Sequence, residues 1–279
     1  MTASRRRFLA GLCPVAFASL GGCLGSVGRF GDGSGSEDGE NGGVTVHDVT
    51  VRPAVVALDS PDSYGVYGDR NEQYLIADVE TADPGAYPAD GFAIGTPDGT
   101  HPATAGIGED PWSLPGFGDA YGLPESDPAA RGWIAVPLSK PLSGAEDARL
   151  VRPDGEHALP EAARARLVRP PTDFEVSFEA PESVSIGGTV TARVTVSNVG
   201  DVDGTFVAAL NRRGPRIAYA PAEAIAISVP AGEIAVRKFE FPVSDPEIAD
   251  LEDPSMRLDL RWRDGDRTRE TTIEAGGSA

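Results

Sequence analysis

The residues that most often carry nucleophilic or metal chemistry are scarce in this chain. It has 2 cysteines and 3 histidines among 279 residues, and His47, His101 and His157 lie in different segments. A zinc or copper centre needs several such ligands at suitable spacings, and no HExxH or CxxC pattern occurs. GxSxG and P-loop patterns are also absent, and no GxGxxG follows a strand. We therefore expect no catalytic residue, no metal and no cofactor, although the residue types of a Ser–His–Asp triad are all present.

Two short acidic segments could offer carboxylates to calcium, DVDG at 201–204 and DGD at 264–266. Calcium takes six or more oxygen ligands, and each segment supplies few. Because Asp and Gly also favour turns between strands, we interpret both segments as turns.

A long segment between residues 95 and 131 shows no clear strand period and carries Trp112, Phe117 and Tyr121. A loop of this length is uncommon inside a domain unless it has a function. Its aromatic side chains either form a binding patch or pin the loop to its own domain. Self-packing is the favoured interpretation, and a binding loop built on these three residues is the alternative.

Both cysteines lie in the first 23 residues, together with the longest apolar run. This run, residues 8–20, is shorter than the ~20 residues that a membrane-spanning helix needs. Its length suits the apolar core of a signal peptide. It follows SRRRFL at 4–9 and ends in LGGC at 20–23.

This order of segments resembles a twin-arginine export signal followed by a lipobox. The resemblance implies that Arg5, Arg6, Phe8 and Leu9 direct export, and that Cys23 becomes the lipidated N-terminus. An ordinary signal peptide with a chance cysteine is the alternative. A two-chain lipid would hold the protein stably at the membrane, whereas one chain would be marginal.

The chain is strongly acidic, with 24 Lys+Arg against 43 Asp+Glu and a net charge of −19. Removal of the leader, with its three arginines and no acid, takes this charge to −22. Such a charge repels nucleic acid and anionic lipid headgroups, so we expect neither as a partner. The balance resembles that of proteins from salt-loving archaea, which implies a fold that needs salt to screen its carboxylates.

Domain boundaries follow from changes in composition. Residues 24–43 are rich in glycine and acids and too poor in apolar side chains to bury a core, so we expect a flexible, disordered tether. A helical pattern at 161–167 ends before Pro170 and Pro171, which cannot continue a helix. The expected divisions are a signal peptide (1–22), Cys23 with the tether (23–43), a first sandwich (44–170), a second sandwich (171–275) and a tail (276–279).

The first domain shows short strand patterns separated by Gly, Pro and Asp, without a strand–helix–strand rhythm. This pattern favours an antiparallel sandwich or barrel. A slip of the alternation at His47 and Asp48 predicts a bulge in the first strand. Segments 73–79, 92–99 and 132–137 resemble immunoglobulin-like lipoprotein domains of unknown function.

Alternation is clearest in the second domain. The strand at 256–262 puts Met256, Leu258, Leu260 and Trp262 on one face and charged side chains on the other, so we expect Trp262 in the core. About seven strands in this length are typical of an immunoglobulin-like domain. PESV at 181–184, the glycines at 187–188, the strand at 190–196 and NVGD at 198–201 resemble CARDB-type domains, which are adhesion-related modules of exported prokaryotic proteins.

These patterns predict an all-β protein, two tandem immunoglobulin-like antiparallel β-sandwiches behind a signal peptide and a disordered tether. The expected function is a non-enzymatic structural or protein-interaction module. A lipid on Cys23 would anchor it to the outer face of the cytoplasmic membrane, with an unknown envelope protein or surface component as partner. The alternatives are a lipoprotein that binds a ligand with the 95–131 loop and, third, a hydrolase with an unrecognised site. The sequence leaves the oligomeric state open.

Overall fold

The computed structural model describes residues 43–108, 113–124 and 129–274. The predicted export residues, Cys23, the tether up to residue 42, Trp112 and the tail lie outside the described residues. Strands dominate the described chain, and most of its pairings are antiparallel. The predicted all-β sandwich class is therefore confirmed. The α-helix in this part of the chain is α1 (Glu161–Leu167), where the sequence predicted it, and three short 3-10 turns are η1 (Ala89–Gly91), η2 (Ala145–Asp147) and η3 (Pro246–Asp250).

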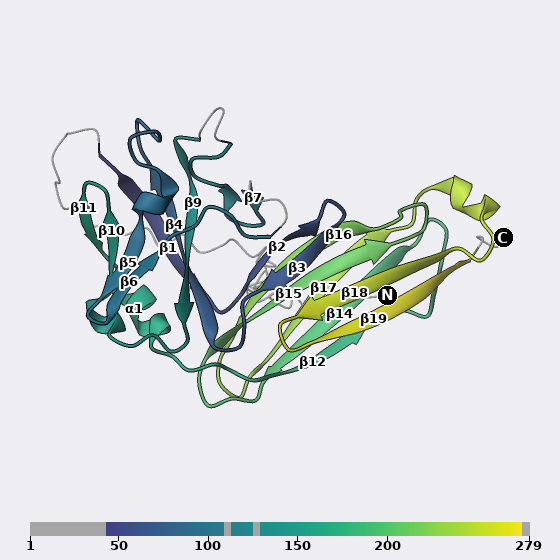
Figure 1. Cartoon of the computed structure of the whole chain (residues 1–279). Coiled ribbons are helices and arrows are strands. Elements are labelled where there is room, and N and C mark those ends of the chain that lie inside the picture. The colour runs from purple at the N-terminus through teal and green to yellow at the C-terminus, as the bar shows by residue number, and fades with distance from the viewer. Residues whose placement is uncertain (1–42, 109–112, 125–128, 275–279) are drawn as a thin grey trace, which may run out of the picture. The chain divides into compact units, whose positions relative to one another are not determined.

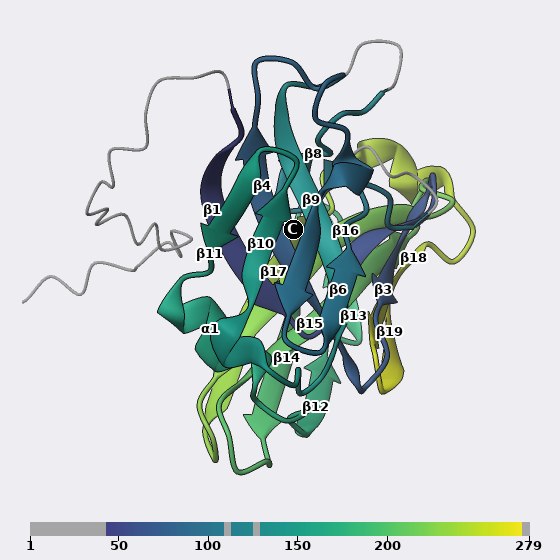
Figure 2. The ribbon, with the colours of Figure 1, turned by 60° about the vertical axis from the view of Figure 1, so that its left-hand side comes forward.

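The first sandwich has two facing sheets. The three-stranded sheet has the order β1 (Thr45–Arg52), β4 (Glu72–Glu80), β9 (Arg131–Ser139). The four-stranded sheet has the order β11 (Gly155–Ala158), β10 (Arg149–Arg152), β5 (Ala93–Thr96), β6 (Gly99–Pro102). Figure 2 shows the second sheet lying over the first, with α1 at one end of the pair. Between the sheets the core contains Leu75, Ala77 and Val79, the face that alternation predicted, together with Phe92 and Leu150.

The first strand carries the predicted bulge. Val46 pairs with Val79 and Asp48 pairs with Asp78, which leaves His47 as the extra residue. The phase slip in the sequence therefore marks a true break in the register.

The described parts of the 95–131 segment are more ordered than their sequence indicated. They contain β6, the short pair β7 (Ser113–Leu114) and β8 (Gly118–Asp119), and single bridges from Thr104 to Ala135 and from Ala120 to Trp133. These contacts place the described parts on the second face of β9, where Trp133 is 1% exposed. Strands of two residues show no period, which is why alternation missed them.

The second sandwich pairs a three-stranded sheet with a five-stranded one (Figure 1). The smaller sheet has the order β12 (Phe174–Glu179), β14 (Thr189–Asn198), β17 (Ile234–Pro242). The larger has the order β13 (Ser183–Ser185), β19 (Gly265–Glu274), β18 (Ser255–Trp262), β15 (Gly204–Arg213), β16 (Ala220–Val229). The inward faces predicted for β14 and β18 are buried in one core.

Trp262 lies at the end of that core and is half-buried. Its ring packs against Phe206 at 6.2 Å between centroids, and the guanidinium of Arg267 covers it at 5.6 Å. Met256, Leu258 and Leu260 are fully buried, so the predicted face of β18 is right. The predicted depth of Trp262 was too great, because the strand leaves the core at this residue.

A hairpin that the sequence did not predict joins the two halves. It consists of β2 (Val55–Ser60) and β3 (Ser63–Tyr67), and it packs on the outer face of β15 (Figure 1). Ala54 and Val56 share a buried cluster with Val207 and Ala209. Both sandwiches thus belong to one compact unit. The domain boundary at Pro170 and Pro171 stays a prediction, and this cluster is a contact across it.

The hairpin is fixed by a buried amide. The backbone N–H of Tyr64 donates to Oδ1 of Asn211 at 2.8 Å, and Nδ2 of Asn211 donates to the carbonyl of Tyr64 at 2.9 Å. Asn211 is 0% exposed. A buried amide that satisfies both backbone groups of one partner residue specifies a single docking register.

Candidate functional site

Two of the three aromatic residues predicted as a binding loop, Phe117 and Tyr121, lie in the described segments, and both pack within the protein. Tyr121 is 0% exposed, and its ring meets Phe92 edge-on at 5.7 Å. Its hydroxyl donates to the carbonyl of Tyr87 at 2.6 Å and lies 3.0 Å from the hydroxyl of Thr81. Phe117 is partly buried against the second face of β9. Tyr121 is therefore a packing group of the first sandwich, and the function of the 95–131 loop stays a prediction.

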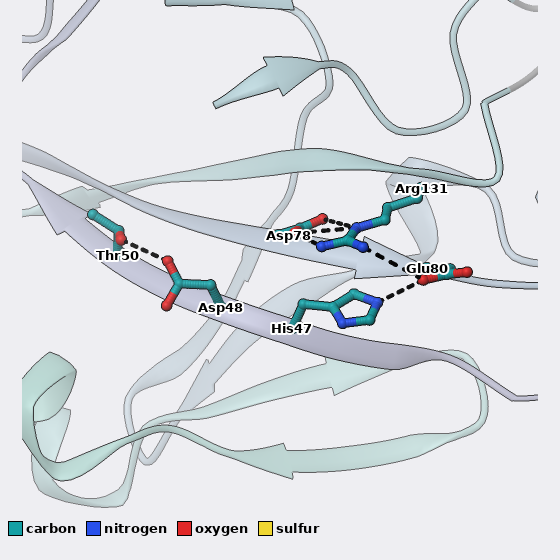
Figure 3. A network of polar contacts seen from close by, with 6 residues as sticks. All are labelled: His47, Asp48, Thr50, Asp78, Glu80 and Arg131. Carbon is teal, nitrogen blue, oxygen red and sulfur yellow. Dashed lines mark hydrogen bonds and ion pairs between the residues drawn. The ribbon is translucent and has the colours of Figure 1, made fainter. Parts of the chain in front are cut away.

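The bulge at His47 supports a polar network on the surface of β1, β4 and β9 (Figure 3). Nε2 of His47 lies 2.6 Å from Oε2 of Glu80, and Nη2 of Arg131 donates to Asp78 at 2.7 Å. The side chains of His47 and Glu80 are 32% and 48% exposed, and ion pairs of this kind contribute ~0–1 kcal/mol. We interpret the network as a cross-strand surface contact. Within the described segments, no group of three or more His, Cys, Asp or Glu side chains could hold a metal ion.

A cleft of about 270 Å³ gathers the basic side chains Lys140, Arg166, Arg169 and Arg263. We call it the basic cleft. Its lining consists of these four residues and Val51, Pro53, Thr172, Phe174, Asp203, Gly204, Thr205, Ser228, Val229 and Pro230.

The ends of two strands and the helix α1 position these basic groups. Lys140 follows β9, and Arg263 follows β18. In α1, Ala163 and Leu167 are buried in the core of the first sandwich, which leaves Arg166 exposed on another face of the helix. The start of β15 and the end of β16 also contribute to the lining.

Lys140 contacts the first sandwich through both its backbone and its amine. Its backbone N–H donates to the carbonyl of Asn71 at 2.7 Å, and its Nζ lies 3.5 Å from Oε1 of Gln73. Gln73 is 0% exposed and donates from Nε2 to the carbonyls of Ser139 and Leu167. Its amide is therefore held with the oxygen available to Lys140.

The electrostatic environment of Lys140 is unfavourable to its charge. Burial, followed by the nearby charges of Arg263 and Arg169, lowers the pKa of Lys140 to about 8. Among the described residues, no carboxylate forms an ion pair with it. A partly buried amine that lacks a counter-ion and has a perturbed pKa is typical of a functional site.

The other basic groups are only partly neutralised. Nη1 of Arg169 lies 3.7 Å from Oδ2 of Asp203, and Nε of Arg263 lies 3.4 Å from Oδ2 of Asp264. Arg166 has no ion pair with any described residue, and after burial it is the main cause of the lowered pKa of Arg52. The cleft therefore has an excess of positive charge.

The rest of the cleft lining is uncharged apart from Asp203. It includes Thr172, Thr205 and Ser228, whose hydroxyls have no hydrogen bond to another described residue. A Cβ at Gly204 would lie 2.7 Å from both Cζ of Phe174 and Cγ2 of Thr172. Glycine at this position therefore keeps the wall in its present shape. Cationic groups and hydroxyls that line one cleft can hold an anion by charge-assisted hydrogen bonds.

Sequence reasoning did not identify the basic cleft. The chain has 2 lysines, Lys140 and Lys238, and a lysine this rare in an acidic chain is a signal that could have drawn attention to Lys140. Its partners are distant in the sequence, and no local pattern connects them.

Comparisons with known proteins identify no family. No family model matches the chain, and no curated protein matches it. Similar solved structures include a β-glucosidase from Listeria innocua (18% identity, TM-score 0.31, 38% of this chain and 16% of that one) and a β-glucosidase from Erythrobacter marinus (20%, 0.31, 37% and 16%). The CARDB domain of a Pyrococcus furiosus protein, in complex with di-metal ions, is 12% identical with a TM-score of 0.28, covering 37% of this chain and 89% of that one. Likenesses of this extent carry no information on activity or ligand.

One further finding concerns membranes. Among the described residues, no helix is long and apolar enough to cross a bilayer.

Proposed function

We propose that the protein is a non-enzymatic interaction module that recognises a negatively charged partner through the basic cleft. One observation carries the proposal. Four basic side chains and a single carboxylate line this cleft, in a chain whose net charge is −19. A cleft lined by one sign of charge concentrates the field and attracts groups of the opposite sign. The cleft is positively charged whereas the whole molecule is negatively charged, so a negatively charged partner is attracted to the cleft.

The proposal includes display at the cell surface. The leader with SRRRFL and LGGC, and the glycine-rich segment after it, support export and a lipid on Cys23. A flexible tether of this length would give the sandwiches an r.m.s. reach of about 25 Å from the membrane. The partner would then be an acidic protein or another anionic component of the cell envelope.

Cell fractionation tests whether the protein is anchored at the cell surface. We expect Cys23→Ser to move the protein from the membrane fraction to the medium, or to leave it unprocessed, because the sulfur carries the lipid. Mass spectrometry of the mature N-terminus is the direct measurement. An unmodified N-terminal residue other than Cys23 would contradict the anchor.

Affinity capture of cell-envelope components by the protein, in high salt, tests whether the basic cleft binds the partner. Arg166→Glu reverses one charge of the cleft at an exposed position without an ion pair among the described residues, so the fold should tolerate it. Lys238→Glu, on β17 and outside the cleft lining, is the matched control. We expect the captured partner to be lost with Arg166→Glu and retained with Lys238→Glu. Equal retention, or equal loss, with both variants would refute the role of the cleft.

A further inference from the structure

We propose that the basic cleft is built for one compact oxyanion, a phosphate, sulfate or carboxylate group, with Lys140 as its central contact. The inference rests on the proposed function and narrows the partner to one that carries such a group. It differs from recognition of an extended polyanion, which needs a row of positive charges along a surface.

The dimensions of the cleft favour a compact ligand. Its volume of about 270 Å³ lies just below the ~300–1,000 Å³ of small-molecule pockets. The four basic groups line this single space together with hydroxyl and apolar groups. One charged group attached to a small uncharged body matches this composition.

Lys140 has hydrogen-bonding capacity that the protein does not use. An ammonium group has three donors, and Gln73 is the one polar side chain of the described residues in contact with its Nζ, at 3.5 Å. Arg169 and Arg263 lie near enough to disfavour its charge. An oxyanion bound among these three groups would convert their mutual repulsion into shared attraction.

The cleft lining also offers a hydroxyl group to a ligand. Thr172 lines the cleft, and its hydroxyl has no hydrogen bond to a described residue. This hydroxyl is not among the buried side-chain atoms without a partner, so it is accessible from the cleft and can donate to a bound oxygen. The carboxylate of Asp203 is compatible with an anion here, because it faces Arg169 at 3.7 Å and accepts from the N–H of Ala231 at 3.1 Å.

Calorimetric titration of the full chain with inorganic sulfate, inorganic phosphate and glucuronate, at constant ionic strength, tests the proposal. We expect saturable binding at one site for at least one of the three probes. Lys140→Gln should weaken it at least about tenfold, because a charge-assisted hydrogen bond is lost. Lys238→Gln removes the other lysine, outside the cleft, and should leave the affinity unchanged.

The outcomes separate this proposal from the proposed function. If none of the three probes binds while capture of the partner still depends on Arg166, the compact-oxyanion proposal is overturned and the function stands. Loss of affinity to the same extent in Lys238→Gln would show a general charge effect and overturn it as well. Absence of both small-anion binding and partner capture would overturn both.

The pH dependence of the affinity of the unsubstituted chain tests the role of Lys140 without the risk that a variant fails to fold. Sulfate and glucuronate keep a constant charge above neutral pH, whereas Lys140 loses its proton; it lies near Arg263, Arg169 and Gln73 and shares the cleft lining with Arg166 and Asp203. The affinity for either of these two probes should therefore fall as the pH rises from about 7 to 10. Phosphate gains negative charge near pH 7, so its affinity is compared from about pH 8 upward, where it should fall as well. A flat profile over this range would contradict a central role for Lys140.

Discussion

Lys140 is a single residue whose charged form destabilises the folded protein. Its pKa falls from 10.5 to about 8 in the folded protein, so the unfolded chain binds more protons between these values. Stability therefore rises with pH across this window and is lowest below about pH 8. A residue that destabilises its own fold is often retained for function.

Replacement of Lys140 should consequently stabilise the protein. We expect Lys140→Met, which keeps the apolar stem, to raise the free energy of unfolding by about 1 kcal/mol at pH 7, a value discounted because the amine is partly exposed and screened. The gain should vanish above the unfolded pKa of 10.5. Denaturant unfolding at the two pH values measures both effects. A loss of stability at neutral pH would show that the ammonium group stabilises the fold.

A second prediction for a single residue concerns Gly204. A methyl group there would lie 2.7 Å from both Phe174 and Thr172, so Gly204→Ala must shift the wall of the cleft. We expect a loss of about 1–3 kcal/mol by overpacking. Gly200→Ala is the control, because its Cβ would meet its nearest neighbours at 3.4 Å. Similar unfolding midpoints for the two variants would contradict the tight wall.

The docked hairpin is the element that connects the two sandwiches. It is fixed by the reciprocal bonds between Asn211 and the backbone of Tyr64, at 2.8 and 2.9 Å, and by the cluster around Val207. Exposed ion pairs, Arg70 with Asp173 and Arg261 with Asp59, add contacts across the same boundary but contribute little each. The buried amide is therefore the stronger determinant of the docking.

Substitution of Asn211 tests how the β2–β3 hairpin is held on β15. Asn211→Asp keeps an acceptor for the N–H of Tyr64 but faces its carbonyl with a carboxylate. We expect a loss of about 1–3 kcal/mol and faster hydrogen exchange in β2 and β3 than in β14. Asn198→Asp alters another buried amide, which bonds to Val202 and Val229, and should leave exchange in the hairpin unchanged. Unaltered exchange in Asn211→Asp would show that apolar contacts alone hold the hairpin.

Net charge governs the behaviour of the whole molecule. With 43 acidic against 24 basic residues, self-repulsion acts against the folded state. Screening shortens from ~10 Å at 0.1 M salt to ~3 Å at 1 M, so we expect the midpoint of thermal unfolding to rise steeply with KCl. Calorimetric scans at low and molar salt measure this rise. A flat dependence would contradict the proposed adaptation to salt.

Much of the fold was predictable because strand burial is a local pattern. Alternation identified the inward faces of β4, β14 and β18, the slip at His47 identified the bulge, and the helix α1 was found at its observed position. Each of these features depends on neighbours within a few residues. The length of the apolar run on β18 did not reveal where the core ends, and so the depth of Trp262 was overestimated.

Tertiary structure alone decided the hairpin and the candidate site. The outer face of β15, with Val207 and Ala209, is buried only because a hairpin from the other half of the chain covers it. Lys140, Arg166, Arg169 and Arg263 meet because separate strand ends and one helix finish at the same place. Local sequence determines which side of a strand is apolar, but the meeting of distant charges depends on how whole elements pack, which no short pattern encodes.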